Sequence, residues 1–233
     1  MWHLMRTIGL IGGMSWESSL EYYRLLNEGT KRRLGQSHSC PNIMYSVDFA
    51  AFEELQHAAA WGVMADEMVR IARILESAGA ELLLICSNTM HKLAPDVEEA
   101  LSIPVLHIAD AAAQRAQELG LGTLGLLGTQ FTMEQGFYRE RLEGHGLTVR
   151  IPAKEQRRAV HAIIYHELIG GQLNPASRKE LQHIIADLAA EGCSGVVLGC
   201  TEIPLLIQQE HSPIPVLNTT ELHAGAALMR ALA

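Results

Sequence analysis

The chain has 233 residues, of which 48% are hydrophobic and 19% charged, so it can build a substantial core and does not have the composition of a disordered protein. Its formal net charge of −8 argues against a general binder of nucleic acids or of anionic membranes. It contains no signal-peptide pattern and no run of about 18 apolar residues, so we expect a cytoplasmic protein with reduced thiols and no membrane span.

Short apolar runs alternate with amphipathic stretches along the first half of the chain. This alternation is typical of an α/β fold with parallel sheets. The predicted elements, in chain order, are a strand at 7–11, a glycine turn at 12–15, a helix at 16–34, a strand at 42–47, a helix at 61–77 and a buried strand at 82–85. In the helix at 61–77, the positions expected to face inward are Val63, Met68, Ile71 and Leu75.

The second half of the chain repeats the first. "TIGLIGGMSWES" from Thr7 returns as "TLGLLGTQFTME" from Thr123, and "AGAELLLICSNT" from Ala78 returns as "EGCSGVVLGCTE" from Glu191. A third pair, "IPVLHIADA" and "IPVLNTTEL", follows in the same order. Three ordered matches indicate an internal duplication, and hence two similar domains.

The register of the duplication singles out one pair of residues. Aligning the two buried strands places Gly199 at the position of Cys86, and Cys200 at the position of Ser87. Reacting groups in parallel sheets gather beyond the carboxyl ends of strands, so Cys200 and Ser87 are expected at equivalent places in the two domains. Neighbouring residues of a strand point to opposite faces, so Cys86 and Ser87 need not both point toward a site.

The sequence resembles the cofactor-independent aspartate/glutamate racemase superfamily, close to its YgeA-like amino-acid racemase branch. The matching stretches are "TIGLIGGMSWES", "CSNTMH", "LHIADA", "LLGTQFTME", "IIYHEL" and "GCTEI". The resemblance implies two α/β domains related by a pseudo-two-fold axis, with an active site in the cleft between them. It also implies that the last strand and helix cross back, giving one domain of residues 1–103 plus 213–233 and another of residues 104–212.

The resemblance further implies a mechanism without PLP or metal, in which two cysteines exchange protons with opposite faces of the substrate's α-carbon. The second-half cysteine falls on Cys200, whereas the first-half position, directly before Asn-Thr, is Ser87. A thiol has a reference pKa of about 8.5, and a serine hydroxyl is a far poorer base. We therefore expect an asymmetric racemase with Cys200 and Ser87 as catalytic residues, and Cys86 as the alternative partner thiol.

The residues beside this pair are candidates for substrate binding. Asn88 and Thr89 are expected to bind the α-carboxylate at a helix start, mirrored by Thr201 and by Glu202, which would hold the ammonium group. Simple helix capping is the alternative for these residues. The remaining candidates are Met14 and Ser15 in the glycine turn, their counterparts Thr129 and Thr132, and Gln56, for which an exposed helix position is the alternative.

The histidines are expected to be structural, although His91 and His107 lie close enough to the motifs to support the site. The chain has no Cys/His pattern or zincin spacing, so no metal is expected.

The expected substrate is a small amino acid. Relatives specialised for aspartate carry a lysine where this chain has Ile169, and no Arg or Lys lies between residues 42 and 69. Arg157 and Arg158 are the cations that could compensate. Aspartate or glutamate remains the substrate class that the resemblance implies, with a neutral amino acid such as homoserine as the alternative.

Three other functions stay open on this fold. They are maleate isomerisation, decarboxylation of a malonate, and non-catalytic amino-acid binding. A homodimer is the assembly that the resemblance allows.

Overall fold

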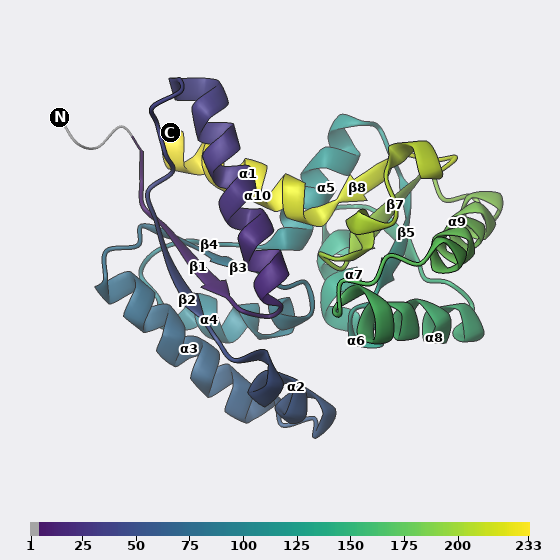
Figure 1. The fold of residues 1–233 in the computed structure, drawn as a ribbon, viewed down its shortest axis with the longest axis horizontal. Coiled ribbons are helices and arrows are strands. Elements are labelled where there is room, and N and C mark those ends of the chain that lie inside the picture. The colour runs from purple at the N-terminus through teal and green to yellow at the C-terminus, as the bar shows by residue number, and fades with distance from the viewer. Residues whose placement is uncertain (1–4) are drawn as a thin grey trace. The chain divides into compact units, whose positions relative to one another are not determined.

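The computed structural model describes residues 5–233. The first four residues of the N-terminal stretch, for which no signal peptide is expected, lie outside the described residues. The chain forms two compact units, one reaching up to His107 and including His223–Ala233, the other covering Ile108–Leu222 (Figure 1). The expected division into domains of residues 1–103 plus 213–233 and residues 104–212 stays a prediction, except for the last strand, whose pairing is described below.

The first unit contains a parallel sheet of four strands in the order β2-β1-β3-β4. Its strands are β1 (Ile8–Gly12), β2 (Asn42–Ser46), β3 (Leu82–Ile85) and β4 (Val105–Leu106). Its helices are α1 (Trp16–Leu34), α2 (Phe49–His57), α3 (Trp61–Ser77), the 3₁₀ helix η1 (Thr89–Leu93) and α4 (Ala94–Ala100). The helices predicted at 16–34 and 61–77 and the strand at 82–85 are confirmed.

One predicted core position in α3 is wrong. Val63 is 57% exposed, and Met64 is buried instead. The buried side chains of this helix follow one another at intervals of three or four residues from Met64 through Met68 and Ile71, and that spacing places them on one helical face. Val63 lies about 100° away from its neighbour around the helix axis, so it turns toward solvent.

The second unit repeats the strand order of the first, with β6-β5-β7-β8 all parallel. Its strands are β5 (Thr123–Gly128), β6 (Thr148–Arg150), β7 (Gly195–Gly199) and β8 (Val216–Asn218). Its helices are α5 (Ile108–Glu118), α6 (Gln130–Glu134), α7 (Gly136–Gly144), α8 (Lys154–Ile163), the π-helix η2 (Ile164–Leu168), α9 (Pro175–Ala190), η3 (Ile203–Leu205) and η4 (Gln209–His211). The shared order confirms that the sequence repeats are structural repeats.

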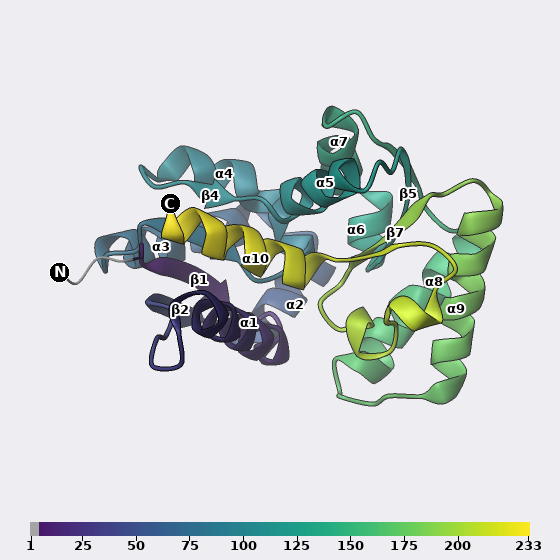
Figure 2. The same cartoon turned by 90° about the horizontal axis from the view of Figure 1, so that it is seen from above.

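The expectation that the last strand and helix both return to the first domain is wrong for the strand. β8 pairs with β7, so it closes the second sheet. Only α10 (Thr219–Leu232) continues into the first unit, where Ala227 and Leu228 pack in a core cluster with Ile8 and Leu10 of β1 (Figure 2). In the same way α5, which follows the last strand of the first sheet, packs in the core of the second unit.

Candidate active site

Cys200 directly follows β7, whose strand residues are all buried. The Cys200 side chain is 8% exposed and belongs to the same core cluster as Val196 and Leu198, so it continues the face of β7 that α8 and α9 cover. Val197 packs in the cluster on the other face. The strand therefore delivers the thiol to its own carboxyl end, as the sequence predicts.

The Cys200 thiol donates a hydrogen bond to a carboxylate. Its Sγ lies 2.9 Å from Glu202 Oε2, and Thr201 Oγ1 donates to the same oxygen at 2.8 Å. Burial, followed by the charge of Glu202, raises the pKa of the Cys200 thiol well above its ordinary value. At neutral pH this cysteine is consequently a protonated thiol in the structure.

Ser87 lies at the equivalent place beyond β3, two residues after Ile85. Leu83 and Ile85 face the cluster formed with α3 and α4, whereas Leu84 and Cys86 face the opposite cluster with α1 and α10. Alternation therefore assigns Ser87 to the face that corresponds to Cys200. Its side chain is nearly buried, at 9% exposure.

The packing argues against Cys86 as the partner thiol. Cys86 is fully buried among apolar side chains that include Tyr22 and Leu26, and burial alone raises the pKa of its thiol strongly. The two other cysteines of the chain, Cys40 and Cys193, are both buried.

Asn88 and Thr89 are both buried, at the start of η1. Asn88 makes no side-chain cap bond to this helix, and Glu202 makes none to η3, so capping does not explain either residue. The predicted helix start is only a five-residue 3₁₀ helix, with α4 beginning at Ala94. The helix dipole is therefore a weaker reason for carboxylate binding here than the sequence indicated.

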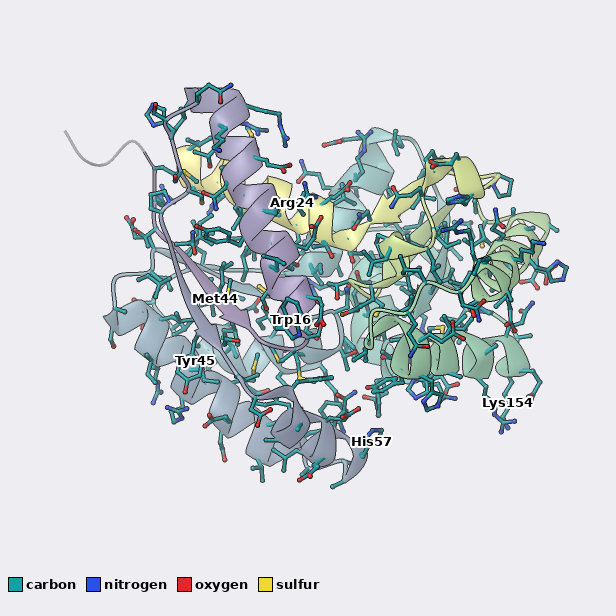
Figure 3. The ribbon with its side chains drawn as sticks, in the orientation of Figure 1. Trp16, Arg24, Met44, Tyr45, His57 and Lys154 are labelled. Atoms are coloured by element: carbon teal, nitrogen blue, oxygen red, sulfur yellow. The ribbon has the colours of Figure 1, made fainter. Side chains whose placement is uncertain are left out.

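The glycine turn after β1 is held tightly. Gly13 has φ +89°, and a Cβ at this position would collide with the Val47 carbonyl oxygen. Ser15 accepts a bond from Ser18 N at 3.4 Å as the N-cap of α1. Met14 is buried in the first unit's core, whereas Trp16, labelled in Figure 3 at the start of α1, is 64% exposed.

The second-half counterparts of the turn also have capping roles. Thr129 is the N-cap of α6, accepts a bond from Thr132 N at 3.3 Å, and its hydroxyl lies 3.2 Å from that of Thr132. Gln56, for which an exposed position was the alternative, is 3% exposed although it lies one residue before His57, which ends α2 (Figure 3). The alternative of an exposed helix position is therefore wrong for Gln56.

A cluster of buried histidines lies beside Ser87, and only part of it was anticipated. His91 Nδ1 donates to the Ser87 carbonyl oxygen at 2.7 Å, and its ring is 4.6 Å from that of His107 and 5.5 Å from that of His223. The ring of His223 bridges the Tyr22 hydroxyl and the Leu106 carbonyl oxygen, each at 2.8 Å. No sequence signal marks His223, because Tyr22 lies 201 residues away along the chain.

A pair of aromatic side chains beside Thr129, formed by His161 and Tyr165, was not predicted from the sequence. His161 Nδ1 accepts a bond from Gln130 N at 3.3 Å, and its ring lies 4.6 Å from that of Tyr165. Tyr165 belongs to the π-helix η2, a type of helix that is frequent at functional sites. The π-helical turn has no sequence signature of its own, although its residues lie within "IIYHEL", one of the stretches on which the resemblance to the racemase superfamily rests.

The two arginines expected to compensate for the missing lysine have other partners. Arg157 contacts Glu134 at 2.8 Å and donates to the Pro152 carbonyl oxygen, and Arg158 contacts Glu155 at 3.0 Å. Ile169 packs against the core of the second unit. Within residues 5–233, no group of three or more His, Cys, Asp or Glu side chains is placed to hold a metal, and no helix is both long and apolar enough to cross a membrane.

The two repeated parallel sheets flanked by helices match the fold of known Asp/Glu racemase structures. The chain belongs to the Asp/Glu/Hydantoin racemase family, whose model matches residues 11–227. A Yersinia pestis structure assigned to the Asp/Glu racemases is 47% identical, with a TM-score of 0.93 over 98% of this chain and 100% of that one. An aspartate racemase homologue from Pyrococcus horikoshii is 33% identical, with a TM-score of 0.86 over 98% and 100%.

Two relatives in sequence carry names of racemases. The broad specificity amino-acid racemase RacX of Bacillus subtilis is 22% identical across 97% of this chain and 98% of its own length. A glutamate racemase of Ectopseudomonas mendocina is 28% identical across 72% of this chain, and the match spans 62% of that relative's length.

Proposed function

We propose that this protein is a racemase of amino acids that inverts the α-carbon by proton transfer through Cys200, without PLP and without a metal. Family membership and the names of the relatives support the reaction class. The observation that carries the proposal is the Cys200 thiol at the carboxyl end of β7, bonded to a buried carboxylate. Parallel sheets place reacting groups at such strand ends.

The proposed proton transfer uses Cys200 in its thiolate form. The thiolate takes the α-proton, so that the C–H bond breaks, an S–H bond forms, and the electron pair stays on the α-carbon as a carbanion. Ser87, directly or through a water, then returns a proton to the other face. Asn88, Thr89, Gln56 and Thr129 are the candidate contacts that hold the amino acid in place.

Ser87 makes the proposed reaction asymmetric. A hydroxyl can give a proton to a carbanion, but it is a poor group for removing one. Exchange should therefore be fast for the enantiomer that presents its α-proton to Cys200, and slow for the other. The equilibrium between the enantiomers does not change, because a catalyst scales both directions of a complete interconversion equally.

Proton NMR in D₂O tests this proposal. The protein, without added PLP, is incubated with the L- and D-forms of aspartate, glutamate and homoserine, and loss of the α-proton signal is followed. We expect exchange in one enantiomer to exceed that in the other, and Cys200→Ala to abolish both. Cys193→Ala is the matched control, since that thiol is also buried in the second unit. Equally fast exchange from both enantiomers would contradict the asymmetry.

The same experiment decides between substrate classes. Aspartate and glutamate follow from the family, while the apolar Ile169, packed against the core, and the ion-paired Arg157 favour a neutral side chain such as that of homoserine. A charge-assisted contact contributes about 1.5–3 kcal/mol, so the absence of a cation at position 169 weakens selectivity for dicarboxylates.

Decarboxylation, isomerisation and non-catalytic binding each predict a different experimental result. Arylmalonate decarboxylase shares the fold, at 16% identity and a TM-score of 0.53. Conversion of a malonate or of maleate without exchange of any amino acid would establish those chemistries, and amino-acid binding without exchange would establish a binding protein. A homodimer stays a prediction, which light scattering at known protein concentrations tests.

A further inference from the structure

His91 forms a hydrogen bond with the backbone of Ser87, the residue proposed to return the proton. Its Nδ1 donates to the Ser87 carbonyl oxygen at 2.7 Å, a distance at the short end of the usual range for N–H···O bonds. Because a carbonyl oxygen can only accept, this contact requires a proton on Nδ1. His91 is 1% and Ser87 9% exposed, so bulk water competes little for the bond. The bond fixes the plane of the peptide that follows Ser87.

The His91 ring is itself held by two other buried histidines of the first unit. His107 directly follows β4, and its ring lies 4.6 Å from that of His91 at an interplanar angle of 61°. His223 belongs to α10, and its ring lies 5.5 Å from that of His91 at 67°. The two nitrogens of the His223 ring bond to the Tyr22 hydroxyl and the Leu106 carbonyl oxygen, each at 2.8 Å. These edge-on contacts restrict rotation of the His91 ring, so its Nδ1–H keeps its direction.

None of the three histidines recurs in the second repeat. In the register of the sequence repeats, the corresponding positions are Pro204, Asn218 and Ala112. The side chain of proline has no hydrogen-bond donor, so the second repeat cannot form the same bond with the carbonyl of Cys200. The histidine group is consequently not part of the duplicated framework that both sheets need. It belongs to the repeat that contains the serine.

A serine that returns a proton depends strongly on its position. Its hydroxyl gives up a proton far less readily than a thiol does, so the transfer requires close and well-directed contact with the carbanion. A misplacement of about 1 Å can cost about 10²-fold in rate. Only one side-chain torsion separates the Ser87 hydroxyl from the backbone, so a bond that fixes the backbone at this residue also limits where the hydroxyl can lie.

We propose that His91 positions Ser87 for the return of the proton, and that His107 and His223 hold the His91 ring for this task. His91 is a positioning residue, because it bonds the backbone of Ser87 and takes no proton itself. In the step that it supports, the Ser87 O–H bond breaks, the electron pair of the carbanion forms the new C–H bond, and water reprotonates the serine oxygen. This inference rests on the proposed racemase function and ties the histidines to inversion rather than to removal of the α-proton.

The first test needs no substrate. NMR is recorded on protein with ¹⁵N in the histidine rings and ¹³C in the serine carbonyls, and the signals are assigned by substitution. We expect the His91 proton on Nδ1, and a Ser87 carbonyl signal that moves in His91→Ala. His91→Asn should restore the signal, because its amide nitrogen takes the place of Nδ1, whereas His91→Gln, with the amide one bond further out, should not. A His91 ring protonated only on Nε2, or a carbonyl signal that stays in place in His91→Ala, overturns the proposal.

The second test separates inversion from removal of the α-proton. In D₂O, Cys200 alone can exchange the α-proton of the enantiomer that faces it, because it removes a proton and returns a deuteron to the same face. Inversion needs Ser87 as well. Exchange is measured by proton NMR and inversion by chiral chromatography. We expect the ratio of inversion to exchange to fall about tenfold or more in His91→Ala and His91→Gln, while the exchange rate changes by less than about threefold. His91→Asn should keep most of the wild-type ratio.

The supporting ring and the control are tested in the same way. His223→Gln can keep the bond to the Leu106 carbonyl oxygen but loses the ring, so it should lower the ratio in the same direction. An unchanged ratio in this variant overturns the role given to His223. Ile71→Val is the matched control, since it shortens a fully buried side chain of the same unit and leaves the His91 bond in place. Its ratio should equal that of the wild type.

The outcomes separate this inference from the proposed function. If inversion and exchange fall in parallel in His91→Ala, or if their ratio stays at the wild-type value, His91 has a structural role only, and the proposal is overturned even in an active racemase. If no amino acid exchanges its α-proton in the wild type, the racemase proposal fails. The NMR experiment then decides by itself whether His91 fixes Ser87.

Discussion

Placing a thiol at position 87 should remove the asymmetry of the proposed reaction. Ser87 is nearly buried, and replacing its Oγ by sulfur changes the volume little, so Ser87→Cys should fold. The face that carries Leu83 and Ile85 continues to this residue, so the new thiol takes the place that Cys200 has in the other repeat. A positioned acid or base contributes about 10²–10⁴-fold to proton transfer. We therefore expect exchange of the slow enantiomer to accelerate by about 100-fold or more, and that of the fast enantiomer to change by less than tenfold.

The assay is α-proton exchange in D₂O with each enantiomer of the preferred amino acid, reported as the ratio of the two rates. Cys86→Ser is the matched control, because it exchanges sulfur and oxygen one residue away in the same strand end. That variant places a hydroxyl in an apolar cluster and should lose about 1–3 kcal/mol of stability, while the ratio stays as in the wild type. A ratio in Ser87→Cys that equals the wild-type ratio, in protein that is folded by circular dichroism, would refute the catalytic role proposed for Ser87.

Three further predictions concern the framework. Tyr22→Phe leaves the buried His223 Nδ1 without its partner and should lower the free energy of unfolding by about 1–3 kcal/mol, measured by urea denaturation. Gly13→Ala places a Cβ at a residue of positive φ and against the Val47 carbonyl oxygen, so the thermal midpoint of unfolding should fall by several degrees. Gly62→Ala is the control and should not lower the midpoint, because Gly62 has no positive φ and no atom close to the new Cβ. Burial raises the pKa of the Cys40 thiol to about 11, above its value in the unfolded chain. Between about pH 9 and 11 the unfolded chain therefore binds fewer protons than the folded one, and the free energy of unfolding falls as the pH rises. This fall should be smaller in Cys40→Ala.

The sequence predicts the framework well where the signal is local. The alternation of apolar runs and amphipathic stretches indicates the first three strands and the two long helices of the first unit, and the three ordered repeats anticipate the shared strand order. The register of the repeats also places Ser87, rather than Cys86, at the position of Cys200. The register decides between the two residues because side chains alternate strictly between the two faces of a sheet, so a shift of one residue moves a side chain to the opposite face.

Features that depend on contacts between residues far apart in the chain were not predicted from the sequence. β8 stays with β7 because of pairing between strands, and no property of residues 216–218 alone distinguishes the two sheets. Gln56 has the sequence context of a surface helix, yet its amide is buried. The contact between Tyr22 and His223 joins the two ends of the chain. The hydrogen bond from Cys200 to Glu202 is different, because both residues stand in the motif "GCTEI". The motif does not indicate, however, that the carboxylate accepts from the thiol.

The divergence of the two repeats leads to a last prediction about the thiol introduced by Ser87→Cys. The new side chain would have Thr89 where Cys200 has Glu202, so the position two residues further on would carry no carboxylate to oppose its ionisation. Of the two strand-end thiols, the one introduced at position 87 should thus be the more acidic. We expect iodoacetamide to modify it at lower pH than Cys200 in the same molecules, as resolved by peptide mapping. The added substitution Thr89→Glu should reverse the order or remove the difference, because it recreates the Cys-x-Glu arrangement in the first repeat. If Cys200 is modified first in Ser87→Cys, the Glu202 carboxylate does not govern the acidity of the neighbouring thiol.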